Sequence, residues 1–290
     1  MRYLVTGGCG FIGSNLVKRL RMNGNRVMVA DNLLTGKRES IDQDIPLVND
    51  TKEALSERFD GVFHLGMPSS TYMLRENPVL VARTINGFIE LLEYCRKNKV
   101  KMVYASSSSV YNGNKIPFTE EMRLFPKDLY TEMIYFIERL SLVYNELFGV
   151  ESIGLRLFSV YGDNEESKGS FANLVSQMIW AKEKGETFDI YDSQTMRDFI
   201  HVDDVVDAFV NSMGSGFGCD VINIGRGKSC GIVDIAKVIG VDYRFVENPV
   251  KNYVRETHAD ITKAQKLLGF RAKTDVRDYI KSRLTQQSRT

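Results

Sequence analysis

The sequence contains little of what several classes of protein need. Its 290 residues include only four cysteines and three histidines, with no C-x-x-C pair, so we expect neither a disulfide framework nor a metal site. Lysine and arginine number 38 against 37 acidic residues, a net charge of +1, which argues against a nucleic-acid or anionic-membrane binder. No run approaches the ~20 apolar residues of a membrane span, and no signal-peptide pattern is present. We therefore expect a cytoplasmic protein.

Short apolar runs alternate with longer amphipathic ones in the first half of the chain. We expect strands at 2–6, 26–30, 45–48, 61–65, 101–105 and 152–157, and helices at 12–22, 79–97 and 130–147. This alternation predicts an α/β fold of the Rossmann type, with a doubly wound, mostly parallel sheet. Helical patterns continue at 171–184, 205–213 and 232–239, but the strands between them are short. We expect one domain over 1–162 and a smaller C-terminal α/β lobe over 163–290, some segments of which return to the main sheet.

A glycine-rich turn follows the first expected strand. Gly7, Gly10 and Gly13 form a G-x-x-G-x-x-G pattern that leads directly into a helix. Glycine lets the backbone approach a diphosphate, and the helix N-terminus offers it free N–H groups. Asp31 ends the second strand, where a carboxylate accepts hydrogen bonds from the ribose hydroxyls and repels a 2′-phosphate. The pattern favours NAD, although the basic pair at 37–38 leaves NADP open.

Further motifs extend this pattern over nearly the whole chain. They are TGGCGFIGSNL (6–16), DNLLTGKRE (31–39), VFHLG (62–66), YASSSSVY (104–111), Pro126 with Tyr130, LRLFSVYG (155–162), RDFIHVDDVVDA (197–208), NIG (223–225) and ADITKAQKLLGF (259–270). With these motifs the chain resembles the extended short-chain dehydrogenase/reductases, in particular their nucleotide-sugar epimerase and dehydratase branch. The resemblance implies an NAD-binding domain over 1–162 and a nucleotide-sugar-binding lobe over 163–290. It also implies a homodimer that pairs the helices around 89–92 and 137–143.

The resemblance assigns a set of residues to the cofactor. Asp50 and Thr51 would contact the adenine, and Leu65 and Gly66 would line the cofactor channel. The full set that would bind NAD is Gly7, Gly10, Phe11, Ile12, Gly13, Asp31, Asn32, Gly36, Asp50, Thr51, Leu65, Gly66 and Tyr130.

Two candidate catalytic residues follow from the family pattern. Ser107 lies three residues before the valine of Val-Tyr, and its hydroxyl can hydrogen-bond the sugar hydroxyl that is oxidised. Tyr130 is placed by Pro126 four residues before it, Glu138 eight after it and Gly149 nineteen after it. Its phenol would take the proton of that hydroxyl, which requires a pKa below the usual value of about 10.

The residue that lowers this pKa in the family is absent. Ile134 stands where the resemblance implies a catalytic lysine, one helical turn after Tyr130. Reading the motif over 135–139 instead restores a tyrosine and a basic residue but loses the three markers. Three explanations stay open: NAD⁺ alone tunes the phenol, another residue substitutes, or the change impairs the enzyme. Thr84 and Ser159 also replace family asparagines.

The second lobe is expected to hold the nucleotide of the substrate. The substrate-binding residues that the resemblance implies are Ser107, Ser159, Asn173, Leu174, Tyr191, Arg197 and Arg255. Arg197 would grip the diphosphate, because a guanidinium fork suits phosphate oxygens, and Tyr191 would stack on the base. The alternative for Arg197 is a surface ion pair with Asp198 or Asp203. Asp203 and Asp204 are expected mainly to cap the helix that follows.

The resemblance therefore implies an NAD-dependent enzyme that acts on a nucleoside-diphosphate sugar. The main expectation is 4-epimerisation of a UDP-hexose by transient oxidation at C4. A 4,6-dehydratase would need an acidic pair where Ser108 and Ser109 stand, and a decarboxylase would need an arginine that we cannot place. The alternative is not an enzyme but a relative that binds NAD and a sugar nucleotide without turnover. Ile134 in place of the family lysine supports this alternative.

Overall fold

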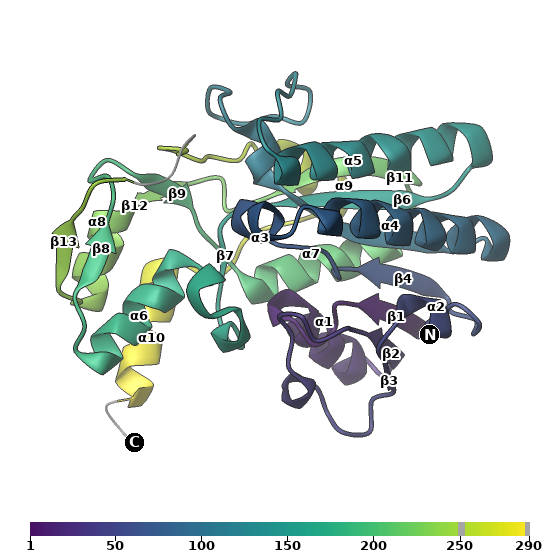
Figure 1. Cartoon of the computed structure of the whole chain (residues 1–290), viewed down its shortest axis with the longest axis horizontal. Helices are drawn as coiled ribbons and strands as arrows, with labels where there is room; N and C mark the ends of the chain where they lie inside the picture. Colours follow the sequence, from purple (N-terminus) through teal and green to yellow (C-terminus); the bar gives the residue numbers. More distant parts are fainter. Residues whose placement is uncertain (249–252, 288–290) are drawn as a thin grey trace.

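A seven-stranded parallel sheet forms the centre of the molecule (Figure 1). The computed structural model describes residues 1–248 and 253–287. The strands lie in the order β11–β6–β5–β4–β1–β2–β3, and every pairing is parallel. Their bounds are β1 (Arg2–Thr6), β2 (Arg26–Ala30), β3 (Leu47–Val48), β4 (Gly61–His64), β5 (Lys101–Ser107), β6 (Ser152–Leu157) and β11 (Cys219–Ile224). The predicted doubly wound α/β fold is confirmed.

Helices cover both faces of this sheet, which is why the central strands are apolar on both sides. One face carries α1 (Phe11–Met22), α7 (Val202–Gly214) and α9 (Thr262–Leu268). The other carries α2 (Thr51–Ala54), α3 (Thr71–Glu76), α4 (Val79–Asn98) and α5 (Leu129–Phe148), and Figure 1 shows α4 and α5 side by side. Within the described residues, no helix has the length and apolarity needed to cross a membrane.

A smaller group of elements has an apolar core of its own, which includes Met178, Ile235 and Ile280. It contains α6 (Leu174–Lys184), α8 (Ile232–Ile239), α10 (Val276–Gln287), β8 (Phe188–Ile190), β9 (Met196–Asp198), β12 (Ser229–Gly231) and β13 (Tyr243–Phe245). The short pair β7 (Val160–Tyr161) and β10 (Ile200–His201) links it to the sheet. β11, α7 and α9 come from the second half of the chain but pack on the main sheet. The division at 162/163 stays a prediction.

The start of α7 differs from the sequence prediction. We expected Asp203 and Asp204 to cap this helix, but it begins at Val202 and its N-cap is His201, whose Nδ1 accepts from the Asp203 N–H at 3.2 Å. The carboxylate of Asp204 is buried and accepts from the backbone N–H groups of residues 273–274 at 3.0 and 3.1 Å. This carboxylate therefore joins the segment before α10 to α7, a long-range contact that local spacing does not reveal.

Candidate active site

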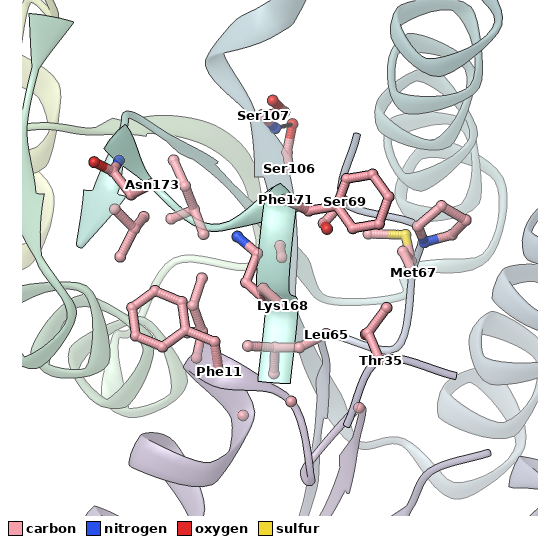
Figure 2. A pocket seen from close by; sticks show the side chains of 18 of the residues that line it. Phe11, Thr35, Leu65, Met67, Ser69, Ser106, Ser107, Lys168, Phe171 and Asn173 are labelled. Carbon is pink, nitrogen blue, oxygen red and sulfur yellow. Dashed lines mark hydrogen bonds between the residues drawn. The ribbon is translucent and has the colours of Figure 1, made fainter. Parts of the chain in front are cut away.

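A cavity of about 300 Å³ opens where β1, β4, β5 and β6 end, between the sheet and the smaller lobe (Figure 2). Ligands of doubly wound folds bind at this edge of the sheet. The expected site residues that line the cavity are Gly7, Gly10, Phe11, Ile12, Gly13, Leu65, Ser107, Tyr130, Ile134, Ser159 and Asn173. The fold thus gathers parts of the expected cofactor, catalytic and substrate sets in one place.

The glycine turn packs too tightly for side chains. Gly7 has a φ of +69°, and a Cβ there would lie 2.6 Å from the backbone nitrogen of Gly66. A Cβ on Gly13 would lie 2.0 Å from the carbonyl oxygen of Gly7. The N-cap of α1, Gly10, offers no side-chain cap, and the first turn holds no acidic residue. The backbone N–H groups of this helix end therefore suit an anionic group such as a diphosphate.

We expect Gly13→Ala to weaken NAD binding by at least about tenfold and to lower the free energy of unfolding by about 1–3 kcal/mol, since the turn must move away from the helix. The matched control is Gly87→Ala on α4, where a Cβ meets nothing within 4 Å. That change should stabilise the protein by about 0.5–1 kcal/mol. NAD titration and urea unfolding measure both effects. Normal NAD binding by the Gly13 variant would show that this turn does not hold the cofactor.

Asp31 lies beside the glycine turn, as its place at the end of β2 suggests. One carboxylate oxygen accepts from the Cys9 N–H at 2.9 Å and the other from the Leu33 N–H at 2.8 Å. Each oxygen keeps capacity for a further hydrogen bond, so the carboxylate is fixed but still able to accept from a ribose. The expected cofactor residues that lie outside the cavity lining are Asp31, Asn32, Gly36, Asp50, Thr51 and Gly66.

Ser107 and Tyr130 are brought together from different elements. Ser107 ends β5, where its hydroxyl accepts from the Ser109 N–H at 3.2 Å. Tyr130 lies in the first turn of α5, which the side chain of Asp128 caps. Both side chains line the cavity, and the Ser107 hydroxyl lies near enough to lower the pKa of the Tyr130 phenol. The alternative motif over 135–139 places neither its tyrosine nor its arginine in the cavity lining, so the geometry favours Tyr130 and Ile134.

The environment of Tyr130 opposes ionisation. Burial raises the pKa of the phenol, the neighbouring Ser107 hydroxyl lowers it, and the negative charge of Asp128 raises it further, with a net increase. Ile134 lies one helical turn along, is 2% exposed and lines the same cavity. An isoleucine contributes no charge that would lower this pKa. The protein without ligand therefore lacks a side chain at position 134 that could prepare Tyr130 as a base.

A buried charged network lies behind the serine strand end. Glu138 receives two hydrogen bonds from Arg156, at 2.9 and 2.8 Å, and one from the hydroxyl of Ser106. The Ser106 hydroxyl in turn accepts from the Ser107 N–H at 2.7 Å. Arg156 also donates to the hydroxyl of Tyr111 at 2.6 Å. The sequence analysis used Glu138 only to place Tyr130 within its motif. Its buried partner Arg156 is 18 residues away, and local sequence does not reveal such a pairing.

A second cavity, of about 830 Å³, lies in the smaller lobe and includes two of the expected substrate residues, Leu174 and Tyr191. Tyr253 also lines it, and the rings of Tyr191 and Tyr253 are 6.4 Å apart in an edge-to-face arrangement. The guanidinium of Arg197 lies 5.3 Å from the Tyr253 ring centroid. The sequence analysis missed Tyr253, which belongs to no motif of the resemblance.

Arg197 and Arg255 have different surroundings. Arg197 donates to the carbonyl oxygen of Arg255 at 3.0 Å, and within the described residues it forms neither of the ion pairs considered as an alternative. Asp198 instead accepts from three backbone N–H groups. The Nε of Arg255 donates to Asp192 at 2.8 Å at an exposed position. Neither arginine lines either cavity, so the expected phosphate contacts of both stay predictions.

The sequence analysis assigned no role in the site to two residues of the first cavity. Lys168 and Phe171 line it from the 3₁₀ segment η3 (Glu166–Phe171), which precedes α6. Phe171 packs against Tyr72 of α3, with ring centroids 5.6 Å apart. The segment has no apolar periodicity, so only its long-range contacts show that it borders the site.

The fold and this site define a dinucleotide-binding enzyme of the Rossmann class. A family model described as the NAD-dependent epimerase/dehydratase family matches residues 3–225, and the chain belongs to this family, whose cofactor is NAD. The chain is 32% identical over 295 residues to a putative UDP-glucose 4-epimerase of Methanocaldococcus jannaschii, with 96% of this chain and 95% of the relative covered.

Two further comparisons relate this chain to a second kind of epimerase and to a solved structure. The chain is 31% identical over 292 residues to an ADP-L-glycero-D-manno-heptose-6-epimerase of Brachyspira hyodysenteriae, with 90% and 89% of the two chains covered. Its structure is similar to the UDP-glucose 4-epimerase of Thermotoga maritima with UDP-glucose, at a TM-score of 0.91, 29% identity and full coverage of both chains. Similar identity to two different epimerases supports an epimerase that acts on a nucleotide sugar, without deciding the sugar.

Proposed function

We propose that the protein is a UDP-hexose 4-epimerase that acts by transient oxidation at C4. The observation that carries this proposal is that Ser107 and Tyr130 line the same cavity, which the glycine turn borders. NAD, when bound, supplies the hydride acceptor and donor for this chemistry. The uncapped N-terminus of α1, where a Cβ on Gly13 would clash, fits its diphosphate.

The residues of the chain handle the proton of the reaction. Ser107 holds the C4 hydroxyl by a hydrogen bond, and Tyr130 takes its proton when C4 is oxidised. After the keto sugar has rotated in the cavity, so that its other face meets the hydride donor, Tyr130 returns the proton to the C4 oxygen. Small residues such as Ala105 and Ser159 line the cavity together with Ser107, which favours such a rotation.

The second cavity supports the choice of a sugar nucleotide as substrate. Asn173 caps α6 by accepting from the Val175 N–H at 3.0 Å. Asn173 lines the first cavity and Leu174 the second, so the N-terminus of this helix borders both. A diphosphate there would meet this helix end. The aromatic rings of Tyr191 and Tyr253 offer a stacking surface for a base.

A second candidate is a protein that binds NAD and a sugar nucleotide without turnover. Ile134 and the raised pKa of Tyr130 favour it, because nothing at position 134 promotes the phenolate. Proton NMR separates the two candidates. The purified protein is incubated with UDP-glucose, UDP-galactose, their N-acetyl forms and an ADP-heptose, without added cofactor. The proposal predicts the C4 epimer of a UDP-sugar; binding without any epimer favours the second candidate, and a product from the ADP-heptose alone contradicts the proposed substrate.

Ile134→Lys is expected to raise the rate of interconversion at neutral pH by about 10²-fold, since it restores one preorganised charge beside the phenol. The ammonium lowers the pKa of Tyr130. Because the reaction uses the phenolate, the rate rises with pH through that pKa, and the rising limb moves to lower pH. The pH profile of the rate measures this. The control is Ile134→Met, which keeps the volume and adds no charge. An unchanged profile in the lysine variant would exclude Tyr130 as the base.

We also propose a homodimer. The outer side of α5 carries apolar residues at positions i, i+4, i+7 and i+11, namely Phe136, Leu140, Val143 and Leu147. Of these, Phe136, Val143 and Leu147 are 47%, 37% and 65% exposed. This stripe has the spacing with which two helices pack together. Leu92 and Ile137, which the resemblance also placed at the interface, are buried in the core of the chain.

We further propose a reducing cytoplasmic location. Cys9, Cys95, Cys219 and Cys230 are all free thiols. Disulfides are rare in reducing compartments, and three of these thiols are buried among apolar side chains as in a cytosolic protein.

A further inference from the structure

The first cavity is poor in positive charge. Among the described residues that line it, Lys168 is the only lysine or arginine. Its Nζ lies 5.6 Å from the ring centroid of Phe11, the first residue of α1, and Figure 2 shows its side chain inside the cavity. The cavity adjoins two helix ends, those of α1 and α6, and each helix end provides only about half a positive charge. A dinucleotide brings a diphosphate, so one full positive charge in this place matters for binding.

Lys168 is held in place by a buried carboxylate. Glu165 is 1% exposed, and one of its oxygens accepts from the Lys168 ammonium at 3.4 Å and from the Asn173 N–H at 2.8 Å. The other oxygen accepts from the Ser176 hydroxyl at 2.6 Å. The same carboxylate therefore arranges the first turn of α6 and directs Lys168. An ammonium has three donors and this contact uses one, so two are left for a ligand.

The segment that carries Lys168 is attached to both parts of the molecule. Asn15 of α1 donates to the carbonyl oxygen of Asp163 at 3.0 Å and accepts from Asn164 at 3.2 Å. On the other side, Tyr279 of α10 donates to the carboxylate of Asp163 at 3.0 Å. Gly169 has a φ of +52°, which interrupts the helical backbone directly after Lys168. These contacts fix the lysine between the N-termini of α1 and α6.

We propose that Lys168 is a diphosphate ligand of this site. It extends from the second half of the chain to the phosphates at the N-terminus of α1 or, beside Asn173, to those of the sugar nucleotide. Both sources share the same chemistry, an anionic diphosphate that takes the two donors left by Glu165. The second source rests on the proposed function, whereas the first requires only the NAD site.

Binding measurements without turnover test this inference. ADP-ribose and UDP are titrated calorimetrically into the full chain freed of bound nucleotide, and adenosine and uridine, which lack phosphates, are followed by ligand-observed NMR. The variants are Lys168→Gln and Lys168→Arg. The matched control is Lys18→Gln, which removes the same charge from an exposed position of α1 outside the cavity. Circular dichroism confirms that each variant is folded.

We expect Lys168→Gln to weaken binding of ADP-ribose, UDP or both by about tenfold or more, because a charged hydrogen bond is lost. The nucleosides should bind as before, Lys168→Arg should restore most of the affinity, and Lys18→Gln should change nothing. Weaker binding of ADP-ribose alone assigns the lysine to the cofactor diphosphate. Weaker binding of UDP alone assigns it to the diphosphate of the substrate. Unchanged affinity for both diphosphates, equal losses for the nucleosides, or a wild-type protein that binds neither diphosphate overturns the inference. None of these outcomes depends on whether the protein epimerises a sugar.

Discussion

Tyr130→Phe is expected to lower the rate of sugar interconversion by about 10²- to 10⁴-fold, the usual contribution of a positioned acid or base. The ring of Tyr130 is 8% exposed and packs in the core, so the phenylalanine keeps the packing and removes only the hydroxyl. NAD and UDP-sugar should still bind, because the helix ends and Arg197 are untouched. Initial rates by NMR and separate binding titrations measure the two effects.

The control for this variant is Tyr135→Phe on the same helix. Tyr135 is half-buried and does not line the cavity, so its hydroxyl has no part in the proposed proton transfer. The control should keep the wild-type rate. A Tyr130→Phe protein that retains most of its activity, or a Tyr135→Phe protein that loses it, would place the base elsewhere.

Glu138→Ala is expected to lower the free energy of unfolding by about 3–5 kcal/mol, because it leaves the buried guanidinium of Arg156 without its charged partner. Burial alone would lower the pKa of Arg156, but the hydrogen bonds and charge of Glu138 more than offset this and raise it. Arg156 and Glu138 are 5% and 2% exposed at their side chains. Urea unfolding measures the loss. Activity should fall as well, since Ser106 and Ser107 lose their support.

Two variants control for this effect. Glu146→Ala removes an exposed carboxylate near the C-terminus of α5, where a negative charge is unfavourable, and should leave stability unchanged or slightly higher. Replacement of both members of the pair by apolar residues of similar size should recover much of the loss. If Glu138→Ala lowers the free energy of unfolding by less than about 1 kcal/mol, water reaches Arg156 and the ion pair does not stabilise the fold as a buried pair would.

The parts of the site that the sequence predicted are those carried by short, local motifs. The glycine turn and Asp31 each follow a strand directly, so their spacing fixes their place at the sheet edge. Ser107 ends β5 and Tyr130 lies in the first turn of α5, so their places also follow from local motifs. Because the fold itself was predictable from alternating strands and helices, these positions could be expected to meet.

The parts that were missed depend on pairings between distant residues. Lys168 lies in a polar segment whose position depends on contacts with Asn15, which is about 150 residues away. Tyr253 lines the second cavity because its ring packs near the guanidinium of Arg197, which lies far from it in the sequence. The position of Asp204 in the sequence predicts a helix cap, but its carboxylate accepts from the backbone N–H groups of residues 273–274, before α10. Local periodicity contains no information on such contacts.

The measurement that tests the account most directly follows a deuterium label at C4 of the UDP-sugar. UDP-glucose deuterated at C4 is incubated with the purified protein without added cofactor, and the product is analysed by NMR and mass spectrometry. If the hydrogen at C4 leaves as hydride and returns within the same site, the product is UDP-galactose that keeps its deuterium at C4. Loss of the label to solvent, inversion at another carbon, or no product from either UDP-glucose or UDP-N-acetylglucosamine labelled in the same way would contradict a 4-epimerase that uses Tyr130, Ser107 and a retained NAD.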